Sequence, residues 1–281
     1  MSDEPISRLI SFANNTLKIE TKDAQVNNLI GRLYRHIPAH NQNPHTTYRL
    51  WQTNSSKFYQ LYRDDTLIHE SDIIGTVAEF LLGDSSYHLA AHSREGLLFH
   101  AAALAWEGQG VLLPGASGTG KSTLTAWLLT QKFDYLTDEL TFIDCGDDRL
   151  QGFTRPLNLK RPSRQALKAY CDYAAHPHQI VTSPAVDLIP HTLFNPTSQF
   201  SRPPLCLILL PRYQSNKTFE LLPLSKAQAG LALMQTLINA RNLPEHGFPE
   251  ITRLARLVPA YELHYSHFDQ VETQIDKLLK G

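Results

Sequence analysis

The sequence predicts an α/β fold in two parts, a small domain over residues 1–92 and a larger one over 93–281. Short alternating or apolar runs typical of strands come between stretches with the spacing of amphipathic helices. A glycine-rich loop at 115–120 lies between a strand-like run and a helix-like run. A chain of 281 residues is long enough to bury a sizeable core.

Residues 1–92 read as a small α/β unit. The segment "TNSS" at 53–56 separates two alternating runs and is typical of a hairpin turn. Ser71 is a candidate cap for the second helix of this unit. Strands are predicted at 16–20, 46–52 and 57–63, and helices at 24–36 and 72–92.

The larger part begins with two apolar strands joined by the turn "EGQG". The proline-rich stretch 172–204 is predicted to form long functional loops, and the strand at 205–210 is expected to end at Pro211. A strand at 135–136 is predicted to pair with a strand at 140–144. Further strands are predicted at 97–106, 110–115 and 260–265, and helices at 121–131, 225–240 and 269–280.

Composition excludes several classes of protein. Lys plus Arg total 26 and Asp plus Glu total 27, so the net charge of −1 gives no long-range attraction to nucleic acid or to an anionic membrane. The three cysteines, scattered and without a CxxC pair, argue against a disulfide framework or a zinc site and fit a reducing compartment. The first residues lack the apolar core of a signal peptide. A cytoplasmic location is therefore expected.

The run "GASGTGKS" satisfies the phosphate-loop pattern G-x-x-x-x-G-K-[ST]. Its glycines let backbone amides turn inward around an anion, and the following helix directs its positive end at the phosphates. The lysine can reach the β- and γ-phosphates, and the serine hydroxyl can bind Mg²⁺. ATP and Mg²⁺ are therefore the expected cofactors. The nucleotide-binding residues are predicted to be Gly115, Ala116, Ser117, Gly118, Thr119, Gly120, Lys121, Ser122 and Thr123.

Asp138 and Glu139 follow the predicted loop helix on the next strand. Phosphoryl transfer needs an acidic residue that binds Mg²⁺ or accepts a proton. Adjacent residues on a regular strand point to opposite faces of the sheet. Both acids are therefore expected to reach one site only if the strand ends or bends between them.

The stretch "LLFHAAALAWEGQGVLLPGASGTGKSTLTAWLLTQKFDYLTDELTFID" resembles the catalytic core of HPr kinase/phosphorylase, and more closely the HPr-kinase-related proteins of peptide-modification gene clusters. The resemblance implies the compact P-loop kinase core also seen in PEP carboxykinase. It implies that Asp138 deprotonates an acceptor hydroxyl, that Glu139 binds or positions Mg²⁺, and that His100 orients the acids. Lys121 then completes the predicted catalytic set. The family carries Asp-Asp where this chain has Asp-Glu, and its additional glycine-rich loop has no counterpart at 160–200, so phosphorylase activity is not expected.

Three further cations are candidate phosphate or acceptor contacts: Arg155 and Lys160 in "TRPLNLK", and Arg212 after an apolar strand. Arg155 and Lys160 are alternatively surface charges, and Arg212 is alternatively part of a structural ion pair.

The first functional hypothesis is a kinase that phosphorylates a hydroxyl, expected to be serine, of a peptide or small protein. The alternatives are a nucleotide-gated interaction protein without transfer activity and a kinase for a small molecule such as free serine. The resemblance also makes a homo-oligomer possible.

Overall fold

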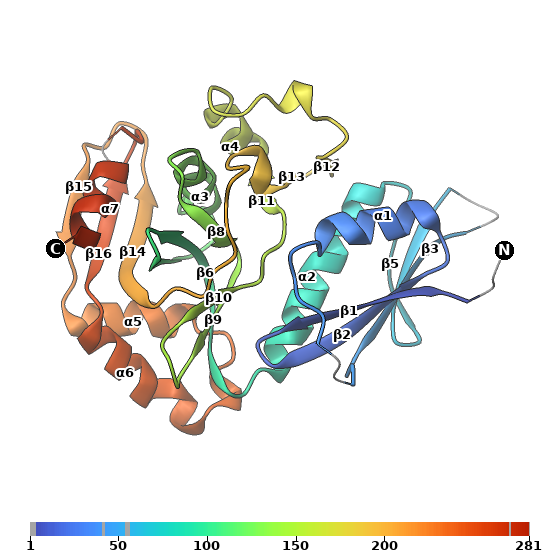
Figure 1. Ribbon diagram of the computed structural model, residues 1–281, viewed down its shortest axis with the longest axis horizontal. Helices are drawn as coiled ribbons and strands as arrows, with labels where there is room; N and C mark the ends of the chain where they lie inside the picture. Colours follow the sequence, from blue (N-terminus) through green and yellow to red (C-terminus); the bar gives the residue numbers. More distant parts are fainter. Residues whose placement is uncertain (1–3, 41–42, 54–56, 270, 281) are drawn as a thin grey trace.

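A computed structural model describes residues 4–40, 43–53, 57–269 and 271–280 and has a mixed α/β architecture (Figure 1). Over these residues it contains seven α-helices and sheets of five, eight and three strands. The five-stranded sheet belongs to the N-terminal part of the chain. The other two sheets are built from residues that follow it.

The N-terminal sheet has the strand order β1-β2-β3-β4-β5 and packs against helices α1 and α2. Apolar and polar side chains alternate along its strands, so one face of the sheet is buried. Leu17 and Ile19 of β2 are buried, whereas Lys18 between them is half-exposed. The Asp23 carboxylate caps α1 by accepting the amides of Gln25 at 2.7 Å and Val26 at 3.2 Å. The elements are β1 Ile6–Phe12, β2 Asn15–Thr21, α1 Ala24–Leu33, β3 Thr47–Gln52, β4 Tyr59–Arg63, β5 Thr66–Ser71 and α2 Ile74–His92.

The predicted strands and helices of this part are present, and β1 and β5 are additional. Strands β3 and β4 pair antiparallel, as a hairpin requires, although residues 54–56 of its predicted turn lie outside the described residues. Ser71 is not the residue that caps α2. The N-cap is Ile73, and the Ser71 hydroxyl instead accepts the Ile73 amide at 3.1 Å.

The eight-stranded sheet has the order β10-β9-β6-β7-β14-β16-β15, with β8 also paired to β6. Helices α3 and α7 contribute to the apolar core on one face, and α5 and α6 to that on the other (Figure 1). Strands β7, β14 and β16 run parallel, so their carboxyl ends meet at one edge. The elements are β6 Gly96–Trp106, β7 Gln109–Pro114, α3 Lys121–Thr130, β8 Asp134–Thr137, β9 Leu140–Asp144, β10 Leu150–Gly152, β14 Leu205–Tyr213, β15 Glu220–Pro223, α5 Lys226–Thr236, α6 Phe248–Leu257, β16 Ala260–Tyr265 and α7 Val271–Lys280.

The expected pairing of the strands around the two acids is wrong. Strand β8 pairs with Ala103–Ala105 of β6 and β9 pairs with 96–100 of the same strand, both antiparallel. Strands β8 and β9 therefore lie one after the other along β6, and the chain bends between them at Asp138 and Glu139. The Glu139 carbonyl accepts a hydrogen bond from the Ala101 amide at 3.0 Å. This bend removes the alternation that would send the two side chains to opposite faces of the sheet.

Three other expectations need correction. Strand β14 continues two residues past Pro211, because at that level its pairing with β7 has ended and β16 is its remaining neighbour. The stretch 172–204 is not entirely loop, since it holds strands β12 Val181–Thr182 and β13 Val186–Ile189, which join β11 Leu157–Lys160 in the small sheet. The predicted helix over 225–240 is shorter, and the described helices also include α4 Arg161–Ala166 and the unpredicted α6.

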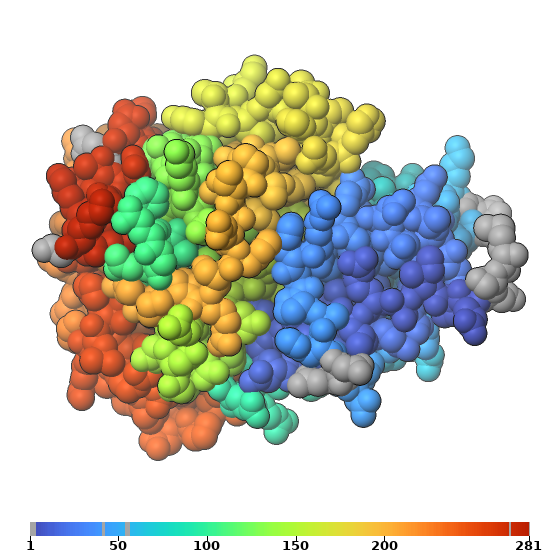
Figure 2. All heavy atoms as spheres, viewed as in Figure 1, coloured from blue at the N-terminus to red at the C-terminus, as the bar shows by residue number. Residues whose placement is uncertain are grey.

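The two parts of the chain are joined by a shared apolar core. Phe153 packs against Phe12 and Tyr34 of the N-terminal part, with ring centroids 5.2 and 6.3 Å apart. On the face shown in Figure 2, atoms of the N-terminal part lie directly against the rest of the chain. Among the described residues, no helix is both long enough and apolar enough to cross a membrane.

Candidate functional site

The glycine-rich loop connects the carboxyl end of β7 to the first residue of α3. Two of its glycines, Gly118 and Gly120, have φ values of 89° and 97°, in the region that L-residues rarely adopt. A Cβ atom on Gly120 would lie 2.6 Å from the Tyr265 hydroxyl and 3.0 Å from the Tyr213 Cβ. Glycine is therefore required at 120 by both the backbone conformation and the approach of β14 and β16.

The loop leaves several amide groups unpaired. Within the described part of the chain, no hydrogen-bond acceptor is found for the backbone amides of Gly118, Gly120 or Lys121. They lie where the first turn of α3 begins, and its positive end adds to their partial charges. Such a set of amides can bind an anion without help from any side chain.

Lys121 is the first residue of α3, and its side chain folds back over the loop. Its ammonium donates to the carbonyls of Gly115 and, at 2.9 Å, of Ala116. The residue is only 6% exposed, and burial lowers its pKa, while the charges of Glu139 and Asp138 act in the opposite direction. The lysine therefore lies close enough to both acids for their charges to influence its pKa.

Asp138 is buried at the bend between β8 and β9. One carboxylate oxygen accepts the Tyr135 hydroxyl at 3.2 Å, and the other accepts the Asn158 amide at 3.0 Å. The Ser122 hydroxyl, from the first turn of α3, lies close enough to this carboxylate to lower its pKa slightly. The bend thus brings the buried acid to the end of the glycine-rich loop.

The protonation of Asp138 is governed mainly by burial, which raises its pKa above the ordinary value. The Arg155 guanidinium opposes this effect, and the charge of Glu139 adds to it. A carboxylate with a raised pKa binds a proton more readily than an exposed one. That is the property a proton acceptor needs when its partner is a weakly acidic hydroxyl.

Glu139 occupies a different electrostatic environment. Arg155 donates to one of its oxygens at 2.8 Å, and His100 of β6 lies 3.3 Å from the other. Burial alone would raise the pKa of Glu139, but the Arg155 and His100 side chains outweigh it and hold the pKa at about 2. The pKa values of these two neighbouring acids are therefore shifted in opposite directions, and Glu139 stays charged to a lower pH than Asp138.

The structure places the three predicted phosphate or acceptor contacts in different environments. Arg155 is 4% exposed and lies beside both acids, with its Nε 3.6 Å from Asp138. Lys160 is an exposed residue at the start of α4. Arg212 is at the carboxyl end of β14, the same edge as the loop, and its Nε donates to Glu262 at 2.9 Å in a half-exposed ion pair.

Ser122 supplies the kind of oxygen ligand that Mg²⁺ prefers, and its hydroxyl lies beside a carboxylate. Among the described residues, no three His, Cys, Asp or Glu side chains are arranged to hold a metal ion. A site of this composition fits Mg²⁺, which usually keeps water and phosphate oxygens as its remaining ligands. It does not fit a metal that requires a complete protein cage.

Sequence reasoning missed Tyr135 and Asn158. The Tyr135 hydroxyl lies within hydrogen-bonding distance of both the Asp138 carboxylate and, at 3.0 Å, the Arg155 carbonyl. Asn158 contributes only its backbone amide, which no residue pattern reveals. The tyrosine was detectable in principle, because it occupies the strand directly before the acidic pair.

Comparison with models of known protein families gave no match to this chain. Comparison with curated proteins also gave no relative.

Proposed function

We propose that the protein is an ATP- and Mg²⁺-dependent kinase that transfers the γ-phosphate to a hydroxyl, expected to be serine, of a peptide or small protein. The proposed fold is the P-loop kinase core of the HPr kinase and PEP carboxykinase type, in a cytoplasmic protein. The observation that carries the proposal is the meeting of Ser122 from the phosphate-loop helix with the buried Asp138 carboxylate. Phosphate-binding and proton-accepting groups then share one site.

In the proposed reaction the loop amides and Lys121 hold the β- and γ-phosphates. The acceptor oxygen forms a bond to the γ-phosphorus as the bond from phosphorus to the ADP oxygen breaks. The proton of the acceptor hydroxyl passes to Asp138, whose burial favours that transfer. His100 and Arg155 hold Glu139 charged and fix its orientation beside the site.

Mg²⁺, when bound, neutralises charge that develops on the phosphate oxygens. Ser122 and Glu139 are the residues proposed to hold or position it. Glu139 already contacts His100 and Arg155, so each of its oxygens has one remaining lone pair to offer. Ser122 is the better placed of the two, because its hydroxyl belongs to the first turn of α3.

The proposal is tested by incubating the protein with γ-labelled ATP, Mg²⁺ and a panel of serine-containing peptides. Wild type is expected to label a peptide, and Asp138→Asn is expected to reduce transfer by about 10²- to 10⁴-fold, the usual contribution of a general base. Asp147→Asn is the matched control, because Asp147 is exposed in the turn after β9, whereas Asp138 is buried at the bend before it. Transfer that survives in Asp138→Asn would remove Asp138 as the base.

A second candidate is a nucleotide-gated interaction protein without transfer activity. It is favoured by one observation: all four oxygens of the acidic pair already have a protein partner, namely Tyr135, Asn158, His100 and Arg155. Such a protein would assemble with its partner only when ATP is bound. ATP-dependent assembly with no labelled acceptor in the same reaction would favour it over the kinase.

A further inference from the structure

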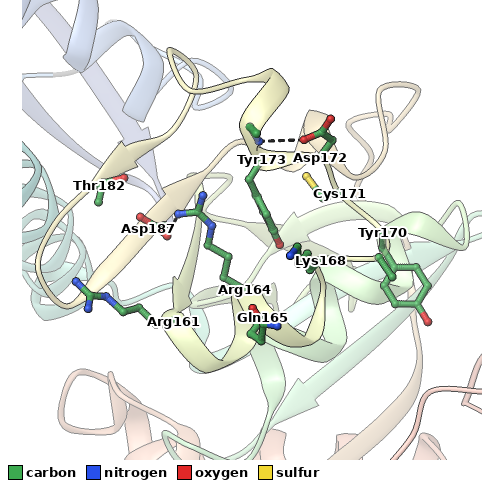
Figure 3. Close-up of a pocket in the computed structure, with 12 residues that line it drawn as sticks. Arg161, Arg164, Gln165, Lys168, Tyr170, Cys171, Asp172, Tyr173, Thr182 and Asp187 are labelled. Carbon is green, nitrogen blue, oxygen red and sulfur yellow. Dashed lines mark hydrogen bonds and ion pairs between the residues drawn. The ribbon is translucent and has the colours of Figure 1, made fainter.

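A second site lies on α4 and the segments around it, beside the proposed kinase site. It is a cavity of about 750 Å³ (Figure 3). We call it the basic pocket; its polar lining includes Arg161, Arg164, Lys168, Tyr173, Thr182 and Asp187. These side chains come from α4, the turn after it, the short 3-10 helix Tyr173–Ala175, and the strands β12 and β13.

The acids of this pocket are already engaged, which leaves unpaired positive charge. Asp187 accepts from Arg164 at 2.7 Å, and Asp172 accepts the amides of Ala174 and Ala175 at 3.0 and 3.3 Å. Within the described ranges, Arg161 and Lys168 have no acidic partner within 4.0 Å. The pocket therefore presents two free cations to a ligand.

Tyr173 provides a second, independent observation that points to a binding site. The residue is only 7% exposed, yet its hydroxyl finds no hydrogen-bond partner among the residues described. Figure 3 shows its ring directed in among the side chains of Arg164 and Lys168, and the Arg164 guanidinium lies 4.7 Å from the ring centroid. A buried hydroxyl without a partner costs free energy, and an acceptor oxygen from a ligand would remove that cost.

The basic pocket is joined directly to both halves of the proposed kinase site. The Thr123 hydroxyl, in the first turn of α3, donates to the Ser163 hydroxyl of α4 at 2.7 Å. Strand β11, which leads into α4, carries the Asn158 amide that binds Asp138. A molecule held by α4 is therefore anchored to the same two elements that carry the phosphate loop and the acid.

We propose that the basic pocket binds a carboxylate-bearing segment of the acceptor, so that the kinase selects peptides with glutamate or aspartate near the target hydroxyl. Arg161 and Lys168 pair with the carboxylates, and the Tyr173 hydroxyl donates to an oxygen of the same segment. One free cation is the first residue of α4 and the other lies two residues past its last, so a chain of residues suits the pocket better than a compact anion does. This inference rests on the proposed function for the identity of the ligand as acceptor.

Binding is measured by fluorescence anisotropy with a labelled peptide of alternating glutamate and glycine around one serine, and with its glutamine counterpart. Wild type is expected to bind the glutamate peptide at least about tenfold more tightly, and added salt is expected to reduce the difference. Arg161→Gln/Lys168→Gln is expected to abolish it. Lys226→Gln/Arg241→Gln, which removes two exposed cations elsewhere, is the matched control and is expected to change nothing.

Tyr173→Phe is the variant that keeps the fold intact, because the buried ring remains. It is expected to weaken binding of the glutamate peptide by about threefold to tenfold, the effect of one lost hydrogen bond. Equal binding of the two peptides, or an equal loss in the control variant, would overturn the proposal. Displacement by millimolar inorganic phosphate without any preference for glutamate would also overturn it, because the pocket would then be a site for small phosphate-containing molecules.

The two proposals fail in distinguishable ways. Asp138→Asn is expected to lose transfer while it keeps the preference for the glutamate peptide. Arg161→Gln/Lys168→Gln is expected to raise KM for the glutamate peptide with kcat unchanged, and to leave ATP binding unaltered. Absence of transfer in wild type would reject the kinase, whereas normal transfer without peptide preference would reject the basic pocket as its acceptor site.

Discussion

Arg155 donates to Glu139 at 2.8 Å from a position that is itself 4% exposed, so one buried guanidinium holds the acidic bend in place. It reaches Asp138 as well, with Nε 3.6 Å from the nearer carboxylate oxygen. The carbonyl of Arg155 is also within reach of the Tyr135 hydroxyl, at 3.0 Å. Its backbone and side chain thus contact three groups of the site.

Replacing this arginine is expected to destabilise the protein strongly. Arg155→Met keeps much of the side-chain volume but leaves two acids without their cation, which should lower the free energy of unfolding by about 3 to 5 kcal/mol. Arg212→Met is the comparison, because its ion pair with Glu262 is half-exposed and should contribute about 1 kcal/mol or less. Urea unfolding followed by circular dichroism measures both. Similar losses in the two variants would contradict the buried role of Arg155.

The lowered pKa of Glu139 predicts a pH-dependent contribution to stability. Its folded-state pKa of about 2 lies below the ordinary value of 4.5, so the charged form stabilises the fold above pH 4.5. That contribution is lost as the pH falls from 4.5 to about 2. It should amount to about 1 to 3 kcal/mol, because a third of the side chain is exposed and solvent screens the pair.

The measurement is the unfolding free energy of wild type and Glu139→Gln between pH 7 and pH 2. Wild type should be more stable at pH 5 to 7, and the difference should shrink toward the acid end. Asp138 acts in the opposite direction, because its pKa is raised in the folded protein. Its protonated form stabilises the fold at low pH, and that stabilisation is lost as the pH rises. Both proteins retain Asp138, so the difference between them reports on Glu139 together with its charge interaction with Asp138. A difference that stays constant with pH would contradict the prediction.

Gly118 and Gly120, the loop glycines with φ values of 89° and 97°, are expected to differ in their tolerance of alanine. Both substitutions force an L-residue into the left-handed region, at a cost of about 1 to 2 kcal/mol. A Cβ at Gly118 would meet no atom within 4 Å, whereas one at Gly120 would press on Tyr265 and Tyr213. Gly120→Ala should therefore be clearly less stable than Gly118→Ala in urea unfolding. The reverse order would show that β14 and β16 do not approach the loop as closely as described.

Lys121 is expected to be needed for ATP binding. For a ligand at about 100 times its Kd, binding stabilises a protein by about 2.7 kcal/mol. Lys121→Met should weaken ATP binding at least about tenfold and so remove about 1.4 kcal/mol of that stabilisation at the same ATP concentration.

Thermal unfolding with and without ATP and Mg²⁺ measures the effect, and the exposed Lys226→Met is the control. Stability without ATP is recorded separately for each variant, because Lys121 also donates to two carbonyls of its own loop. If ATP raises the unfolding temperature of Lys121→Met as much as that of wild type, the nucleotide phosphates do not bind at the amides of the glycine-rich loop.

Local pattern was sufficient to predict the strand, loop and helix around Gly115–Ser122. Such patterns depend on residues close in sequence, such as glycines that permit positive φ and apolar spacing that matches the helical or strand period. The strands around residues 16–20, 97–106 and 260–265 were predicted for the same reason. Pairing was not, because a run such as 135–144 specifies a strand without specifying which neighbour it meets.

The tertiary structure decided which charges meet at the bend. Arg155 follows Glu139 by 16 positions and His100 precedes it by 39. The pairing of β9 with β6 brings His100 to Glu139, and the pairing of β10 with β9 leads the chain back toward the bend at Arg155. Burial of Arg155, which turns a candidate surface charge into the partner of two acids, likewise depends on packing between distant segments. Sequence alone determined the chemistry of the side chains and their local conformations. Their distances, partners and pKa values were decided by long-range contacts, because electrostatic interactions depend on separation in space and on exclusion of water.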